Sequence, residues 1–258
     1  MRLTAGGAAL LACSVLADSA IEHYRGSFHN PAMVAPLVAS SVNIAMGVVQ
    51  AAGGRLPRPV SLGGGGAAIA VGAAGFGFHA FNIMRRPGAI SFSNFFYGAP
   101  VGAPAGLILS GSLAIMASAA SGAILRDFGQ GRAIASVAAL GLGGAVAEAG
   151  LLHFRGAYHN PAMWLPIILP PLGALSLAWD TVKGYGSRRS IRLLLGTALL
   201  GLIGSGFHAL GVVRNMGGWR NRRQNLLAGP PLPAPPSFTG LAVAGLGALK
   251  MVGRRSNG

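Results

Sequence analysis

Long apolar stretches, each separated from the next by a short polar segment, constrain this chain more than any other feature. We identify eight of them, at residues 3–21, 33–53, 62–84, 101–125, 133–152, 162–182, 193–213 and 237–252. About 20 apolar residues are needed for a helix to cross the hydrocarbon core of a bilayer. Only 10% of the residues are charged, against roughly 25% in a soluble domain. The sequence therefore predicts an all-α integral membrane protein with about eight transmembrane helices.

An internal repeat divides the chain into two halves. The segment "EHYRGSFHNPAM" at 22–33 returns as "LHFRGAYHNPAM" at 152–163, with eight of the twelve residues identical. Repetition at a long, fixed spacing indicates repeated structural units. We expect a first four-helix transmembrane repeat at residues 1–128 and a second at residues 129–258.

Two further pairs of segments support this division. The stretch "GFGFHAF" at 75–81 returns as "GSGFHAL" at 204–210, and "NFFYGAPVGAPAG" at 94–106 returns in weaker form as "NLLAGPPLPAPPS" at 225–237. Four spans return the chain to the side from which it started. The two repeats are therefore expected to be parallel, related by an axis along the membrane normal.

Basic residues lie between the apolar runs rather than on one domain. The net charge of +15 is typical of loops that meet anionic lipid, and we expect no nucleic-acid partner. Twelve basic residues fall on the side of the chain ends and eight on the other side. The positive-inside rule then predicts that both termini are in the cytoplasm. Eighteen of the 20 basic residues are arginine, and together with abundant Ala, Gly and Pro this favours a GC-rich bacterial genome and hence a bacterial inner-membrane protein.

All six histidines are expected at one membrane face, the face that carries the repeated HNPAM segments. Each of these segments follows the first apolar run of its half, and another histidine precedes the end of the third run. Because one apolar run brings the chain back across the membrane between the two crossings that end at these histidines, all of these positions are expected on the same side of the membrane. The candidate ligands are His23, His29, His79, His153, His159 and His208.

The repeated segment also carries turn signals. Asn30 and Asn160 each precede a proline, a combination that favours the start of a helix because asparagine caps free N–H groups and proline suits the first turn. Gly26 and Gly156 are expected to permit the turn between two helices. These roles leave the histidines of the segment unexplained.

Four charged residues flank the histidines. Arg25 and Arg155 are expected at the interface, where they would meet lipid phosphate or a bound anion. Asp18 and Glu148 occupy matching positions near the ends of apolar runs, and acids at such depth are candidate functional residues. They would relay protons to a quinone, orient a ligating imidazole from behind, or pair with Arg25 and Arg155.

Paired histidines on different helices can ligate a b-type haem from both sides of its iron. His79 would pair with His23 or His29, and His208 with His153 or His159, while Arg25 and Arg155 would bind the haem propionates. Small residues at two glycine pairs would let the macrocycle lie close to the third helix of each half: Gly75 with Gly77, and Gly204 with Gly206. This pattern predicts haem- or quinone-linked electron transfer.

Two other functions fit the same residues. The histidines could hold a transition metal instead of haem, or the parallel repeats could form a transporter or channel around their axis. Motifs of soluble enzymes, such as a P-loop, GxSxG or CxxC, do not occur in the chain. We therefore expect a membrane anchor for a separate periplasmic or peripheral dehydrogenase rather than a stand-alone enzyme.

Overall fold

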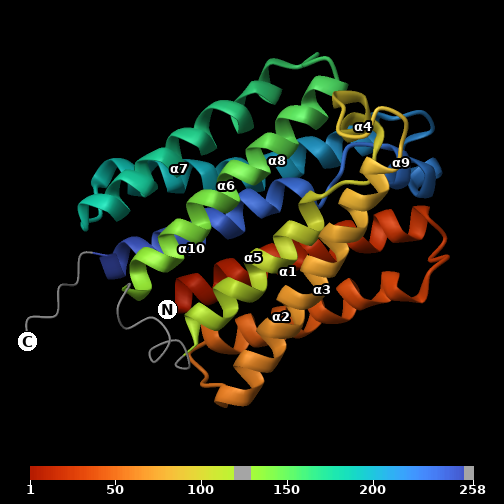
Figure 1. The fold of residues 1–258 in the computed structure, drawn as a ribbon. Coiled ribbons are helices and arrows are strands. Elements are labelled where there is room, and N and C mark those ends of the chain that lie inside the picture. The colour runs from red at the N-terminus through yellow and green to blue at the C-terminus, as the bar shows by residue number, and fades with distance from the viewer. Residues whose placement is uncertain (119–128, 253–258) are drawn as a thin grey trace, which may run out of the picture.

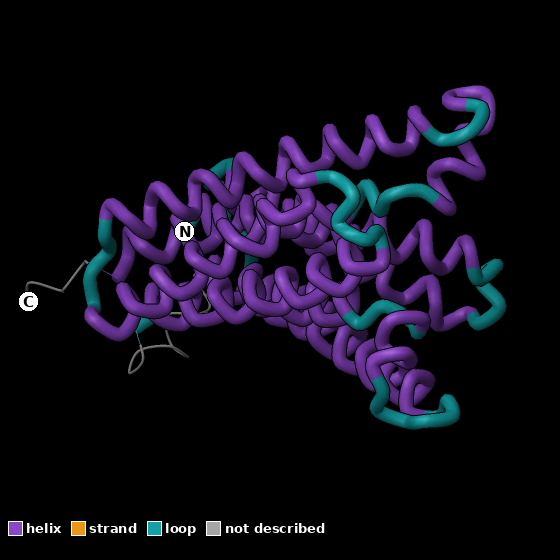
Figure 2. The backbone as a smooth tube through the Cα atoms, turned by 90° about the horizontal axis from the view of Figure 1, so that it is seen from above, coloured by secondary structure: helices purple, strands orange, loops and turns teal. Residues whose placement is uncertain are grey.

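The computed structural model describes residues 1–118 and 129–252, which are mainly helical and contain no strand (Figures 1 and 2). The long helices of the first half are α1 (Arg2–Arg25), α2 (Ala35–Ala51), α3 (Arg58–Met84) and α5 (Gly102–Ala117). Those of the second half are α6 (Gln130–Arg155), α7 (Leu165–Lys183), α8 (Arg188–Arg214) and α10 (Ala234–Val252). Shorter elements are α4 (Phe92–Tyr97), α9 (Arg222–Ala228) and the 3-10 turns η1 (Pro31–Val34), η3 (Pro161–Trp164) and η4 (Gly218–Asn221).

Six helices in the described part of the chain are long and apolar enough to cross a membrane. They are α1, α3, α6 and α8, together with α2 and α7 when these are counted from the 3-10 turns before them. Each has between 21 and 27 residues, and 21 residues of helix extend about 31 Å, close to the thickness of a bilayer core. The prediction of an all-α, multi-pass membrane protein is confirmed.

The other two predicted spans, α5 and α10, do not meet these criteria. α5 has 16 residues, and the apolar run expected there, 101–125, continues into residues outside the described ranges. α10 has 19 residues, but it carries two prolines in its first turn and Lys250 in its last. Eleven of its residues are buried. A helix surrounded by other helices contacts less lipid, so its composition is set by helix packing more than by the bilayer.

Corresponding helices of the two halves have corresponding neighbours. α1 packs against α2 and α5, as α6 packs against α7 and α10, and α3 packs against α5, as α8 packs against α10. The halves meet where α10 lies along α1 and where α5 lies along α6 (Figure 1). Because α2 and α7 each return the chain once, the ends of α1, α3, α6 and α8 that carry the histidines point the same way.

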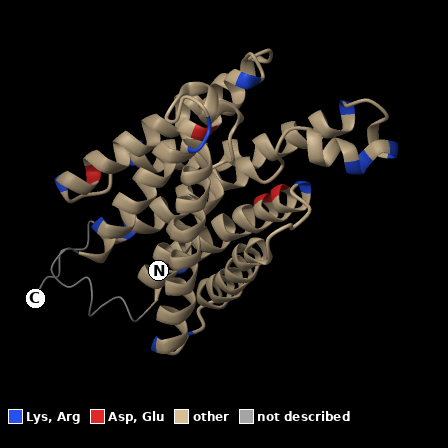
Figure 3. Ribbon diagram, turned by 45° about the vertical axis from the view of Figure 1, so that its right-hand side comes forward, with Lys and Arg blue, Asp and Glu red and all other residues tan. Residues whose placement is uncertain are grey.

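Charged residues gather toward the ends of the helices (Figure 3). This distribution is expected of a membrane protein, because a charge at the bilayer centre is costly. Among the twelve basic residues assigned to the side of the termini, Arg126, Arg254 and Arg255 lie outside the described residues. Side chains along the middle of the helices are mostly apolar, and large ones such as Leu140 and Leu175 are more than two-thirds exposed.

Close contact between α1 and α10 depends on small residues. A Cβ atom added at Gly7 would lie 2.5 Å from the carbonyl oxygen of Gly240 and 2.6 Å from the nitrogen of Ala244. At the other end of this contact, a Cβ atom at Gly247 would lie 2.9 Å from the nitrogen of Thr4. Such backbone-to-backbone approach is how membrane helices gain packing energy without a hydrophobic driving force between them.

Replacing Gly7 by valine is expected to separate α1 from α10 and to destabilise the protein by about 1–3 kcal/mol, the usual cost of an overpacked site. The matched control is Gly63→Ala in α3, where an added Cβ atom meets nothing within 4 Å. That change is expected to be neutral or to stabilise by up to about 1 kcal/mol, since alanine favours helix over glycine. Thermal denaturation in detergent measures both. Equal melting temperatures for the two variants would contradict the close packing of α1 and α10.

Candidate functional site

The repeated segment folds in the same way in both halves. After α1, Ser27 and Phe28 have φ values of 57° and 46°, and after α6, Ala157 and Tyr158 have φ values of 54° and 47°. Non-glycine residues rarely adopt this left-handed region. Two consecutive residues at the same point of both copies therefore mark a turn that the surrounding contacts hold in place.

The expected role of Gly26 and Gly156 is only partly right. Both lie at the helix C-cap with φ of −81° and ψ of 9°, values that any residue can adopt, so the left-handed turn does not need them. Their small size is used instead. A Cβ atom at Gly26 would lie 3.1 Å from the Cε atom of Met33, and one at Gly156 would lie 2.9 Å from that of Met163. The glycines thus make room for the methionine of the same segment.

Asn30 and Asn160 act as the sequence predicts. The side-chain oxygen of each accepts a hydrogen bond of 2.9 Å from the backbone N–H two residues later, at Ala32 and Ala162. Both asparagines have extended backbone angles and precede a proline at the start of a 3-10 turn. The turn, η1 or η3, leads directly into the long helix.

Replacing Asn30 by alanine should remove this cap and reduce stability by about 1 kcal/mol, which corresponds to a fall in melting temperature of about 2–4 °C in a chain of this size. Asn160→Ala should have the same effect because its geometry is the same. Asn30→Asp, which keeps an oxygen at the capping position, should stay near wild type. Differential scanning fluorimetry in detergent tests all three variants. If Asn30→Asp lowers the melting temperature as much as Asn30→Ala does, loss of the helix cap is not the cause of the lower stability.

Two of the six candidate histidines are exposed and bound to their own turns. His29 Nδ1 lies 3.0 Å from the carbonyl oxygen of Gly26, and His159 Nδ1 lies 2.9 Å from that of Gly156. These bonds close the turn after α1 and α6. The structure therefore places His29 and His159 on the surface of the loop.

His23 and His153 are half-buried and link the first two helices of each half. His23 Nδ1 lies 2.6 Å from the carbonyl oxygen of Met33, and His153 Nδ1 lies 2.8 Å from that of Met163. The rings also contact the aromatic residue of the turn edge-on, with centroids 6.1 Å apart for Phe28 and 6.2 Å apart for Tyr158.

His79 and His208 are half-buried near the ends of α3 and α8. The Nδ1 atom of His79 is hydrogen-bonded to the carbonyl oxygen of Pro100, and that of His208 lies 2.7 Å from the carbonyl oxygen of Pro231. Both prolines belong to the loop before the fourth helix of their half. Each of these two histidines therefore ties its own helix to that loop.

Buried asparagines hold these loops in shape. The side-chain nitrogen of Asn94 donates to the carbonyl oxygens of Pro87 and Ala89, at 3.1 and 2.8 Å. At the matching position, Asn225 donates to the carbonyl oxygen of Gly218 at 3.0 Å. No local motif marks these two residues, although the weak repeat of 94–106 at 225–237 contains both. They fix the path of the loops that carry the proline carbonyls.

The same nitrogen is used in all six rings, and this has a chemical consequence. A carbonyl oxygen only accepts hydrogen bonds, so each Nδ1 must carry the proton, and in the neutral ring Nε2 then carries the lone pair. Metal-binding histidines commonly donate their other ring N–H to a backbone carbonyl in this manner, which fixes the tautomer and orients the ligand. The local structure prepares Nε2 as a ligand or proton acceptor.

The structure brings His153 and His208 together. Their ring centroids are 6.4 Å apart and the ring planes are inclined by 62°. His153 comes from α6 and His208 from α8, and both helices pack against α7 and α10. Of the two partners expected for His208, the half-buried His153 rather than the exposed His159 is the one in ring contact. Among the described residues, no other two histidine rings are in contact.

The two arginines of the repeated segments have different surroundings. Arg25 forms an ion pair with Glu22 at 2.7 Å, whereas the guanidinium of Arg155 lies over the rings of Phe96 and Tyr97, at 5.4 and 6.0 Å from their centroids. Both arginines are exposed. Neither forms the expected ion pair with Asp18 or Glu148 within the described residues.

Asp18 and Glu148 come near one another where the two halves meet. Both are half-buried, and the Asp18 carboxyl group is acted on by the charges of Glu148, Glu22 and Arg25. The carboxylate of Glu148 accepts a hydrogen bond from the backbone N–H of Gly102, at the start of α5. A side chain at Gly102 would occupy the place of that carboxylate. The Glu148 carboxylate therefore lies against the start of α5, a helix of the first half.

Short helices connect the halves at this end, an arrangement that the apolar pattern of the sequence does not predict. Phe92 and Phe96 of α4 contact Phe154 at the end of α6, with centroids 5.8 and 6.0 Å apart. In the reverse direction, Arg223 of α9 lies 5.5 Å from the ring centroid of Tyr24 in α1 and donates to its hydroxyl oxygen. Each half therefore covers the end of the other half's first helix.

The four glycines expected to line a haem have different surroundings. A Cβ atom at Gly75 would lie 3.5 Å from Pro104, and one at Gly204 would lie 3.1 Å from Pro235, while Gly77 and Gly206 meet nothing within 4 Å. Gly75 lies where α3 packs on α5, and Gly204 lies where α8 packs on α10. Gly75 and Gly204 therefore serve helix packing, as expected for close contacts in membranes, whereas Gly77 and Gly206 face open space.

A cluster of three or more histidine, cysteine or acidic side chains able to hold a metal ion does not occur within residues 1–118 and 129–252. The chain was also compared with known proteins. Family models, curated proteins and solved structures yielded no match.

Proposed function

We propose that this protein is an electron-transfer subunit of the bacterial inner membrane, in which each half holds one b-type haem between two histidines. His153 and His208 would ligate one iron, and His23 and His79 would ligate the other. The haem supplies one-electron transfer, and the chain supplies neutral imidazoles in a fixed orientation. The ring contact between His153 and His208 is the observation that carries the proposal.

The separation of these rings favours ligation from opposite sides of an ion. Bonds of about 2.0 Å place the centroids of two imidazoles about 6.3 Å apart when they face one another across a metal, and about 5.2 Å apart at a tetrahedral metal. The observed value is 6.4 Å. This value is closer to the first separation, so the two imidazoles would be able to hold a haem iron between them.

The hydrogen bonds of the four half-buried histidines are alike in the two halves, whereas the ring contact is found in the second half. His23 and His79 donate Nδ1–H to the carbonyl oxygens of Met33 and Pro100, as His153 and His208 do to those of Met163 and Pro231. The same tautomer is therefore presented in each half. His29 and His159 would remain outside the sites.

We further propose that the protein consists of two parallel repeats of four spans each, with α5 and α10 as the fourth spans. The matching order and matching contacts of the helices support this architecture. α10, largely surrounded by other helices, would cross the membrane inside the protein. The excess of basic residues on the side of the termini favours a cytoplasmic location for that side.

Quinone and a separate periplasmic or peripheral dehydrogenase are the proposed redox partners, because the chain has little mass outside its long helices. Asp18 and Glu148, each one to two helical turns before a half-buried histidine, would relay protons when quinone is reduced. Arg25 and Arg155 are exposed beside His23 and His153, where they would meet lipid phosphate or haem propionates.

Optical spectroscopy of the purified protein, expressed in a host supplied with haem precursors, tests the proposal. Absorption bands of a low-spin b-type haem, shifting on reduction by dithionite, are expected. Elemental analysis of the same sample distinguishes the alternative, because a colourless protein with stoichiometric copper or zinc would indicate a mononuclear metal site. A colourless protein without metal would refute both.

A transporter is the second candidate, favoured by one observation. Asp18 and Glu148, from matching positions of two repeats, interact at the contact between the halves, and acids near such an axis are typical of ion or proton pathways. Reconstitution in liposomes with a pH-sensitive dye would detect proton flux. Flux that is lost in Asp18→Asn, in a protein without visible absorbance, would favour this function over electron transfer.

A further inference from the structure

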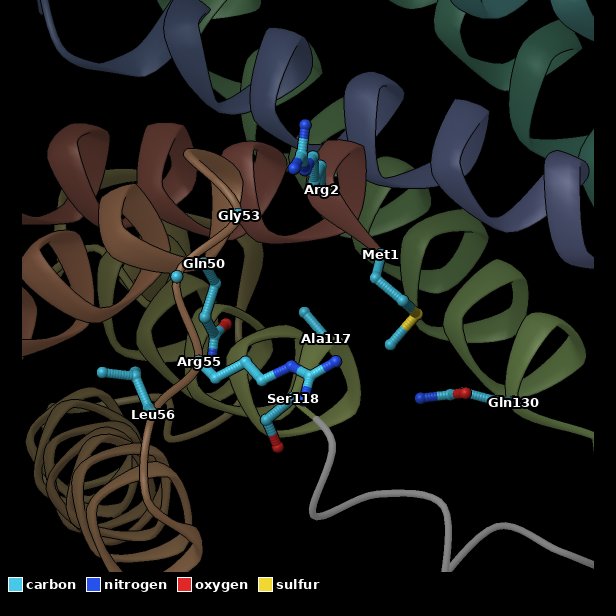
Figure 4. Close-up of a pocket in the computed structure, with 10 residues that line it drawn as sticks. Met1, Arg2, Gln50, Gly53, Arg55, Leu56, Ala117, Ser118 and Gln130 are labelled. Atoms are coloured by element: carbon cyan, nitrogen blue, oxygen red, sulfur yellow. The ribbon is translucent and has the colours of Figure 1, made fainter.

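A cavity of about 360 Å³ lies at the end of the protein opposite the histidines. Its walls come from both halves: the start of α1, the end of α2 and the loop after it, the end of α5, and the start of α6 (Figure 4). The lining residues include Arg2, Gln50, Arg55 and Gln130. None of the functions discussed above uses it.

The lining is positively charged. It contains Arg2 and Arg55 and no acidic residue, and neither arginine forms an ion pair within the described residues. Figure 4 shows the Arg55 side chain extending toward Ala117 across the opening. The cavity therefore offers two guanidinium groups to a negatively charged ligand.

Two helix dipoles add to this charge. α1 begins at Arg2 and α6 begins at Gln130, so the positive ends of both helices lie at the cavity. Neither helix has an acidic residue in its first turn. Helix N-termini attract anions, because their first backbone N–H groups and their dipoles favour negative charge.

Gln50 provides an independent indication of a missing ligand. Its side chain is 8% exposed, and both its nitrogen and its oxygen are buried without a hydrogen-bond partner in the structure. Leaving two polar atoms unsatisfied is costly, so buried polar groups nearly always have partners. A ligand in the cavity that Gln50 lines would give its amide nitrogen an acceptor.

The matching position of the second half is satisfied from within the chain. Asp180, 130 residues after Gln50, accepts a hydrogen bond of 2.6 Å from the backbone nitrogen of Ser187. The guanidinium of Arg132 lies against Gly184 there, as that of Arg2 lies against Gly53 here. The first half thus retains the arginine but replaces the paired carboxylate by an unpartnered amide.

We propose that this cavity binds a phosphate-bearing anion, held by Arg2, Arg55 and the amide nitrogen of Gln50. The phosphate could belong to the headgroup of an anionic lipid or to a soluble phosphate compound. The position at the ends of membrane helices makes both sources accessible.

Native mass spectrometry of the full chain in a neutral detergent tests the lipid source, with phosphatidylglycerol and phosphatidylcholine as probes. Phosphatidylglycerol is expected to bind at least about tenfold more tightly than phosphatidylcholine, and the double variant Arg2→Ala/Arg55→Ala should lose this preference. Arg58→Ala is the matched control, since it removes a positive charge from the start of α3 but does not line the cavity.

Gln50→Leu keeps the proposal testable if the double variant does not fold. Leucine has a similar size without polar atoms, so the ligand-free protein should melt at the same temperature as wild type or higher, while binding weakens about tenfold.

Inorganic phosphate tests the soluble source through its effect on the melting temperature. Phosphate stabilisation of wild type that is absent from Gln50→Leu assigns a soluble anion, and phosphatidylglycerol selectivity alone assigns a lipid. Binding of neither probe, or equal losses in Arg58→Ala, would overturn the proposal.

Discussion

Replacing His208 by alanine is expected to remove about half of the haem bound by the protein. The substitution deletes one of the two imidazoles that would hold the iron of the second half, while the site of the first half keeps both ligands. His153→Ala should have the same effect because it removes the other member of the pair. The haem content per polypeptide, measured by pyridine haemochrome, gives the result directly, and the double variant should lose no more than either single variant.

The matched control is His159→Ala. His159 belongs to the same repeated segment as His153 but is exposed and bonded to its own turn at Gly156, so its loss should leave the haem content unchanged. Size-exclusion chromatography shows whether each variant is folded. If His159→Ala loses as much haem as His153→Ala in folded protein, the assignment of the ligands to the half-buried pair is wrong.

A second large effect is expected for Glu148→Gln. Glutamine has the same shape but cannot take up a proton, so a relay through Glu148 and Asp18 would be interrupted. A positioned proton-transfer group contributes about 10²–10⁴-fold to a rate, and we expect oxidation of the reduced haem by a soluble quinone analogue to slow by at least about tenfold. The haem content should stay at the wild-type value, because Glu148 is not a ligand. Stopped-flow absorbance after reduction with dithionite measures the rate.

Glu22→Gln separates this role from a general change of charge. Glu22 lies on the same face of α1 as Asp18, yet its carboxylate is already paired with Arg25 at the surface, so its removal should change the rate little. Asp18→Asn should resemble Glu148→Gln. Equal rates for Glu148→Gln and wild type would exclude a proton relay through this acid.

Much of the fold follows from the sequence, because a bilayer allows few solutions. Long apolar runs with few charged residues favour membrane helices, and six of the eight predicted runs form helices long and apolar enough to cross a membrane. The Asn-Pro pairs marked the starts of helices correctly, since capping depends on local residues alone. The composition of α10 fits a membrane span less well, because a helix inside a bundle is shaped by its neighbours, as in the close approach of its Gly240 to Gly7 of α1, rather than by lipid.

The candidate site was harder to predict, because its geometry depends on residues distant in the sequence. The apolar pattern placed the histidines at one face but could not tell that His208 contacts His153. The hydrogen-bond partners of their rings are backbone carbonyls. Because every residue has a backbone carbonyl, the sequence does not reveal which residue accepts the bond. The contacts of α4 with Phe154 and of Arg223 with Tyr24 also join opposite halves. No local sequence motif predicts contacts of this kind. The weak repeat around Asn94 and Asn225 was the one available signal.

The haem stoichiometry of the wild-type protein tests the central claim most directly. Protein purified from a haem-replete host should contain close to two b-type haems per polypeptide, one for each pair of half-buried histidines. Pyridine haemochrome combined with amino-acid analysis of the same sample gives this ratio. A value near two is the predicted result, and a wild-type protein without haem would contradict the account.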